Sequence, residues 1–303
     1  MWRPRIVLAI IVLGIVLSGL AAWYESEHQT HTTGYNHLVP IVFLVSLGII
    51  EVIKLVRETA RSKGRLSGQD FLEEYTKLLT DAIEALQDVH TYNATQLLQA
   101  QTKILKLIAA VVVLYHPEAV GLGINANLML NEGVDNHSDG NKFADHVHFS
   151  DPQRTADTYS SVLSIRAWAD PPQVAPHNFS VPVDSDPQRV LFGAPRAFAS
   201  GKEMVIPNIH DRKKVNKELK GQPEVVCNAI HAFFAQQKYR TFMSIVVKNS
   251  DKTIAILNLQ ADQLNVFGNL GKQAEMKKFI EPFSTILGII AAQSLTSGSA
   301  PRP

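Results

Sequence analysis

Three polar side chains interrupt an otherwise apolar stretch near the C-terminal end, and they are the best candidates in the sequence for binding chemistry. Ser244 lies in an expected strand at 241–248, and Asn258 and Gln260 lie in a second at 253–260. Turn-forming residues separate the two strands, which predicts a hairpin. A buried hydroxyl or amide needs a hydrogen-bond partner, which could be backbone, water or a bound small molecule.

This hairpin is apolar on both faces, which is typical of central strands that are covered on both sides of a sheet. Strand alternation separates the side chains into two sets. The face without the polar residues carries Met243, Ile245, Val247, Ala255, Leu257 and Leu259. We therefore expect the hairpin to be central.

Two further residues complete the candidate ligand-binding set of Arg196, Asn208, Ser244, Asn258 and Gln260. Arg196 could meet an anionic ligand through its guanidinium group. The alternative is that Arg196 is a surface charge.

Other polar clusters give weaker signals for chemistry. His146-x-His148, with carboxylates nearby, could hold a divalent metal ion, or could belong to a solvated, flexible insertion. His210-Asp211 could act as an acid/base pair, or simply lie in a charged surface loop. The sequence contains no phosphate-binding loop, nucleophile elbow or HExxH pair. We therefore predict no metal site and no catalytic residues, and expect the protein not to be an enzyme.

Composition narrows the classes of partner. The chain has 303 residues and a formal net charge of +1, so no global field points to nucleic acid. Its one cysteine, Cys227, excludes an internal disulfide.

Two apolar runs near the N-terminus predict a transmembrane hairpin at 1–62. Residues 6–23 carry no charge over a length that crosses a bilayer, and 38–56 is a second, weaker span. Lys and Arg flank both spans, whereas the connecting loop has none. The positive-inside rule therefore predicts a multi-pass protein of the bacterial inner membrane, with both termini and the soluble domain in the cytoplasm. Alternatively, the first run is a cleaved signal peptide.

A helical connector is expected at 63–93, followed by a soluble domain at 94–297. Apolar residues from Leu72 to Val89 recur at spacings of three and four, the pattern of a coiled-coil seam. This helix could pair with a second copy or pack on its own domain.

The soluble domain reads as helix, strand, strand, short helix, strand, helix, two strands and a final helix at 272–293, in which Pro282 predicts a kink or a break. We expect residues 170–187 to be a loop and 210–221 a charged connection. This order predicts an α+β domain with a mainly antiparallel sheet flanked by helices.

From Leu191 onward, four stretches of the sequence follow the element pattern of one known domain family. GAPRAFASGKEMVIPNIHD resembles the short helix, small-Gly-Lys element and apolar strand of that family, and YRTFMSIVV the strand after its internal helix. DKTIAILNLQAD is similar to its Gly-x-x-hydrophobic-Gly-x-hydrophobic-Asn strand, with Ala255 in place of one glycine. NVF followed by a long amphipathic helix resembles the end of the family's domain. Together these stretches resemble a GAF domain, and the resemblance covers 94–296 and is densest over 191–296.

The resemblance implies a sensory module that binds a small molecule on one sheet face and dimerises through its first and last helices. Asn258 matches the asparagine of cyclic-nucleotide-binding members, but Leu259 replaces their basic residue. His231 matches the histidine of bilin-binding members, but Ala232 follows it, and Cys227 lies one helical turn earlier. Neither ligand class is therefore expected, and the cofactor is left open.

The leading hypothesis is a membrane-anchored sensor, a homodimer or higher oligomer, that relays ligand binding through the connector to the spans or to a partner protein. No kinase, cyclase or DNA-binding segment follows the last expected helix. One version is a bacterial defence effector whose spans breach the membrane. The alternative is a ligand-free interaction scaffold whose pocket is filled by side chains such as Phe198 and Phe242.

Overall fold

The computed structural model describes residues 68–87, 89–116, 121–134, 147–171, 179–268 and 270–296. Both predicted membrane spans and His146 lie outside these residues. Packing divides the chain into two units between Leu72 and Glu73, and the second unit contains the sheet and the helices that cover it.

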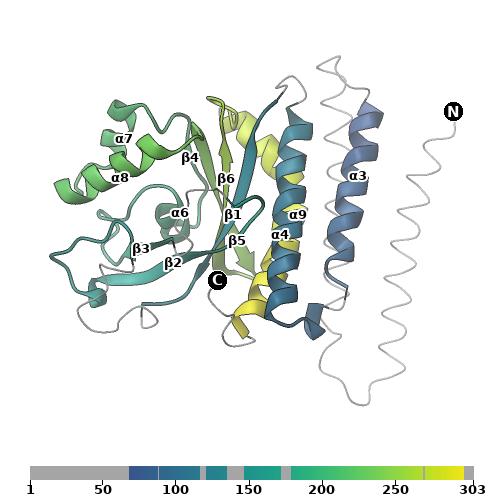
Figure 1. Cartoon of the computed structure of the whole chain (residues 1–303), viewed down its shortest axis with the longest axis horizontal. Coiled ribbons are helices and arrows are strands. Elements are labelled where there is room, and N and C mark those ends of the chain that lie inside the picture. The colour runs from purple at the N-terminus through teal and green to yellow at the C-terminus, as the bar shows by residue number, and fades with distance from the viewer. Residues whose placement is uncertain are drawn as a thin grey trace. The chain divides into compact units, whose positions relative to one another are not determined.

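The second unit is an α+β domain, which confirms the predicted class (Figure 1). In chain order the described elements are α3 (Gly68–Glu84), η1 (Val89–Thr91), α4 (Ala94–Tyr115), β1 (Ile124–Asn131), η4 (Ala156–Thr158), β2 (Tyr159–Trp168), β3 (Ser180–Asp184), α6 (Ala194–Ser200), β4 (Met204–Ile206), α7 (Arg212–Glu218), α8 (Glu224–Gln236), β5 (Thr241–Asn249), β6 (Lys252–Ala261) and α9 (Leu270–Thr296).

The sheet has six strands in the order β3-β2-β1-β6-β5-β4, and every neighbouring pair is antiparallel. The predicted hairpin is confirmed as β5–β6, with its turn at Ser250, whose φ of 53° is left-handed. β6 lies between β1 and β5 near the middle of the sheet. The hairpin therefore joins the two halves of the sheet, as its two apolar faces predict.

One face of the sheet is closed by α4 and α9. On this face Met243 pairs with Leu259 and Ile245 with Leu257, and all four side chains are buried. α4 contacts β1 and β2, α9 contacts β5 and β6, and the two helices pack on each other. This face is the apolar core of the domain.

Helix α4 begins at Ala94, where the predicted soluble domain begins. Asn93 caps its start by accepting a hydrogen bond from the backbone N–H of Gln96, whose side chain in turn accepts one from the Asn93 N–H. Within the described ranges it is the one helix long and apolar enough to cross a membrane, a criterion that buried core helices also meet. Its contacts with the sheet and α9 are those of a core helix.

The connector helix packs on its own domain through one aromatic residue. The Tyr75 hydroxyl donates a hydrogen bond to the backbone oxygen of Phe279 at 3.0 Å. The Tyr75 ring also lies edge-on to the rings of Phe279 and Phe283, each at 5.8 Å between centroids. The sequence left two alternatives for the apolar seam of this helix, pairing with a second copy or packing on its own domain. The contacts of Tyr75 are those of packing on its own domain. α3 ends at Glu84, short of the predicted end of the connector.

Two details of the sequence prediction were wrong, and one of two alternatives for a third was removed. The proline- and aspartate-rich stretch 170–187 contains a strand, β3, which pairs with β2 at the edge of the sheet. An edge strand tolerates Pro182, because an N–H that points away from the neighbouring strand is not needed for the ladder. The charged stretch 210–221 contains the short helix α7, which Asp211 caps by accepting a hydrogen bond from the Lys214 N–H. α9 continues through Pro282, so of the two predicted outcomes the break is absent, and the kink stays a prediction.

The close approach of α9 to β5 gives a stability prediction. A Cβ atom added to Gly288 would lie 2.6 Å from the backbone oxygen of Lys248. Gly→Ala inside a helix normally stabilises by up to about 1 kcal/mol. Here the clash should dominate, so we expect Gly288→Ala to lower the free energy of unfolding by about 1–3 kcal/mol in thermal or urea denaturation.

The matched control is Lys278→Ala, because Lys278 is an exposed residue of the same helix. It should change the free energy of unfolding by less than about 0.5 kcal/mol. A stabilised Gly288→Ala protein would show that α9 does not approach β5 this closely.

Candidate functional site

The second face of the sheet carries a cavity of about 580 Å³. Strands β1, β2, β3, β5 and β6 line one side of it, and α8 and the start of α6 line the other. Its volume falls within the range of small-molecule sites. The cavity therefore lies on the face of the central hairpin that carries the predicted polar residues.

A row of polar side chains crosses three central strands beside this cavity. The register places Ser244 opposite Asn258, and Asn258 opposite Asn127. The Ser244 hydroxyl donates to Oδ1 of Asn258 at 2.6 Å, and Nδ2 of Asn258 donates to Oδ1 of Asn127 at 3.0 Å. All three side chains are buried, with Ser244 at 0% and Asn127 at 1% exposure. These hydrogen bonds fix both amides in one orientation, and we call the row the amide ladder.

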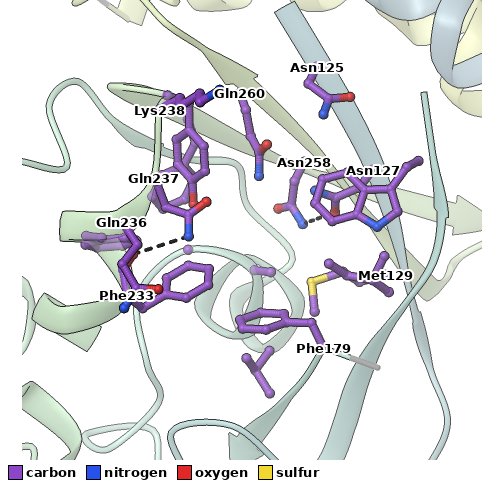
Figure 2. Close-up of a pocket in the computed structure, with 18 of the residues that line it drawn as sticks. Asn125, Asn127, Met129, Phe179, Phe233, Gln236, Gln237, Lys238, Asn258 and Gln260 are labelled. Atoms are coloured by element: carbon purple, nitrogen blue, oxygen red, sulfur yellow. Dashed lines mark hydrogen bonds between the residues drawn. The ribbon is translucent and has the colours of Figure 1, made fainter. Parts of the chain in front are cut away.

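Aromatic rings form the opposite wall. Phe179 and Phe233 are stacked, with centroids 5.1 Å apart and planes 21° apart, and Phe149 lies edge-on to both. Phe149 has a φ of 63°, which is rare for a bulky residue and costs about 1–3 kcal/mol. Figure 2 shows the amides of Gln260, Asn258 and Asn127 facing a space that the rings of Phe233 and Phe179 bound on another side.

Charged groups occur only at one rim of the described lining. Asp170, Asp262 and Lys238 are the charged residues that line the cavity, and all three are exposed. Asn125 joins β1 to the end of β2, because its Nδ2 donates to the Asp170 backbone oxygen at 2.7 Å and its Oδ1 accepts from the Asp170 N–H at 3.2 Å. The interior of the cavity is therefore neutral, and its charges lie at the rim.

The five predicted ligand-binding residues do not all meet at this cavity. Asn258 and Gln260 line it. Ser244 does not line it, but donates a hydrogen bond to Asn258 from the neighbouring strand β5. Arg196 and Asn208 are not among the lining residues. The Arg196 guanidinium group donates to the Glu218 side chain at 2.5 Å and to the Glu218 backbone oxygen at 3.1 Å. Arg196 is therefore better described by the alternative of a surface charge, here paired with Glu218. Asn208 accepts a hydrogen bond from the His210 N–H at 3.0 Å, within a turn.

Several lining residues were not predicted. Asn127 carried a usable signal, since Asn125-x-Asn127 repeats on β1 the polar alternation of Asn258-x-Gln260 on β6. The aromatic residues Phe149 and Phe179 come from outside the helices and strands, where periodicity gives no signal.

The weaker chemical clusters do not converge in the described parts of the chain. No group of three or more His, Cys, Asp or Glu side chains within them is arranged to hold a metal ion. His148 packs against Phe179 with ring centroids 4.7 Å apart, and burial lowers its pKa. His231 shares a hydrogen bond of 2.6 Å with Asn216, and burial raises the pKa of the Cys227 thiol. Neither His231 nor Cys227 lines the cavity.

The amide ladder gives a second stability prediction. Ser244→Ala removes the donor to Oδ1 of Asn258 and leaves a buried acceptor unpaired, so we expect a loss of about 1–2 kcal/mol in the free energy of unfolding. Ser160→Ala is the control, because Ser160 is an exposed strand serine that bonds only a backbone oxygen. Equal melting temperatures for the two variants would contradict a buried ladder.

Comparison of the chain with protein-family models, with curated proteins and with solved structures found no significant match to any of them.

Proposed function

We propose that this chain is a membrane-anchored receptor whose cytoplasmic domain binds a small molecule in the cavity beside the amide ladder. The observation that carries the proposal is the combination of volume and chemistry. A cavity of about 580 Å³ is lined by aromatic rings and by a small number of oriented amides. This is the composition of small-molecule sites, in which an apolar lining gives affinity and a few polar groups set orientation.

The resemblance to GAF domains is part of the same proposal. What supports it is an antiparallel sheet with a cavity on one face, while the first and last helices of the domain, α4 and α9, pack together on the other. Dimerisation through these helices, as the resemblance implies, is proposed with it.

A contiguous route of packed elements could carry a signal from the cavity to the connector. β5 and β6 line the cavity on one face and contact α9 on the other, and α9 accepts the hydrogen bond of Tyr75 from α3. A ligand can shift this assembly only if it binds two arrangements with different affinity. We propose that the shift reaches the predicted spans at 1–62 or a partner protein, and a defence effector that breaches the membrane is one form of it.

The scaffold alternative needs a cavity filled by side chains. Phe242 lines the cavity without filling it, and Phe198 packs in the neighbouring apolar cluster and is not part of the lining. The open volume therefore favours a receptor.

Filling the cavity gives a direct test of the receptor. Met129 is buried on β1, and its sulfur faces the cavity (Figure 2). Met129→Trp should occupy the space that a ligand needs and remove any stoichiometric small molecule detected by native mass spectrometry of the full-length protein.

The matched control is Val225→Trp, since Val225 is 53% exposed on α8 and does not line the cavity. It should retain the bound molecule. A wild-type protein without a bound molecule and without a thermal shift across metabolite libraries would favour the scaffold instead.

The predicted topology can be tested with the single cysteine. In a Cys227→Ser background, Glu27→Cys places a thiol in the predicted external loop and Lys63→Cys places one after the second span. A membrane-impermeant maleimide should label Glu27→Cys in intact cells, and Lys63→Cys only after permeabilisation. Labelling of Lys63→Cys in intact cells would contradict a cytoplasmic domain.

A further inference from the structure

We propose that the cavity takes an uncharged, planar aromatic molecule that presents a ring carbonyl or ring nitrogen to Asn127, and that it rejects phosphate- and carboxylate-bearing compounds. The inference rests on the proposed receptor function and deepens it by naming the chemical class of the ligand.

The amide ladder determines the polarity of the ligand's edge. Ser244 donates to Asn258, and Asn258 donates to Asn127, so the donor left over at the end of the row is Nδ2 of Asn127. Among the described residues none accepts a hydrogen bond from this Nδ2, although Asn127 is only 1% exposed and lines the cavity. The reverse orientation of both amides would take the Asn258 acceptor away from the Ser244 hydroxyl, which is fully buried. The ladder therefore presents a donor, and a ligand acceptor satisfies it.

The aromatic wall determines the shape of the ligand. The stacked rings of Phe179 and Phe233 offer apolar surface across the cavity from the amides, and Phe149, which also lines the cavity, lies edge-on to both rings. Aromatic pairs favour offset-stacked or edge-to-face arrangements, so a planar ring can contact the phenyl rings while its edge reaches the ladder.

The charge distribution excludes anions. The only cationic side chain of the described lining is Lys238, which is exposed at a rim shared with Asp170 and Asp262. Burial raises the pKa of Tyr239, so this lining hydroxyl stays uncharged at neutral pH. An anionic group carried into the interior would lose its hydration and gain no counter-charge.

Three probes of similar outline separate these requirements. 4-Quinolone is neutral and planar with a ring carbonyl, naphthalene lacks the acceptor, and 2-naphthoate carries an anion. We expect the dissociation constant of 4-quinolone for the full-length protein, measured by ligand-observed NMR, to be about tenfold lower than that of naphthalene. We expect 2-naphthoate to bind more weakly than either.

A variant ties this preference to the amide ladder. Asn127→Leu alone would free Nδ2 of Asn258, which also lines the cavity, so the double variant Asn127→Leu/Asn258→Leu is used. It removes both amide donors and should bring 4-quinolone and naphthalene to similar affinity. Asn131→Leu is the control, because Asn131 lies on the same strand but accepts a hydrogen bond from Ser161 and does not line the cavity. It should keep the tenfold preference. If the double variant does not fold, the wild-type ranking of the three probes still decides the proposal.

The outcomes separate the two proposals. Equal binding of 4-quinolone and naphthalene, tighter binding of 2-naphthoate, or a co-purified molecule that bears phosphate or carboxylate would overturn the ligand class and leave the receptor standing. Binding of none of the probes, together with no co-purified molecule, would overturn both.

Discussion

The structure depends on the mutual hydrogen bonding of three polar side chains that lie in the mainly apolar centre of the sheet. Ser244, Asn258 and Asn127 lie side by side on three central strands, where each unpaired group would cost free energy. Ser244 donates a hydrogen bond to Asn258, and Asn258 donates one to Asn127. The donor that remains at the end of the row is therefore Nδ2 of Asn127, which lines the cavity. The opposite face packs against α4 and α9 mainly with apolar residues, and its buried Thr241 hydroxyl donates to the backbone oxygen of Ile206 at 2.7 Å.

This asymmetry gives the two faces different roles. The face under α4 and α9 is tightly packed, and the close contact of Gly288 with β5 shows how little space remains there. The other face has a neutral interior, a wall of phenyl rings and charges only at the rim. In the receptor that we propose, ligand binding in the cavity changes the packing of the sheet on α4 and α9. Tyr75 links α9 to the connector helix α3 through its hydrogen bond to the Phe279 backbone oxygen.

Much of this arrangement could be predicted from the sequence, and the rest depended on contacts between distant residues. Two apolar runs separated by turn residues predicted the central hairpin, and strand alternation within it identified the face on which Asn258 lies. Such patterns missed β3, since Pro182 is acceptable only at the edge of a sheet, and the position of a strand in the order is a tertiary property. The ion pair of Arg196 joins it to a glutamate 22 residues away, and Phe149 comes from a loop. Neither the partner of Arg196 nor the place of Phe149 at the cavity can be predicted from the neighbouring residues in the sequence.

An experimental structure of the full-length protein, purified without added ligand, tests the central claim most directly. The account predicts an open space of several hundred cubic ångströms between the amide ladder and the phenyl rings, with density for a planar molecule against Asn127. Rings of Phe179 and Phe233 packed directly onto the amides, with no room for a guest, would contradict it.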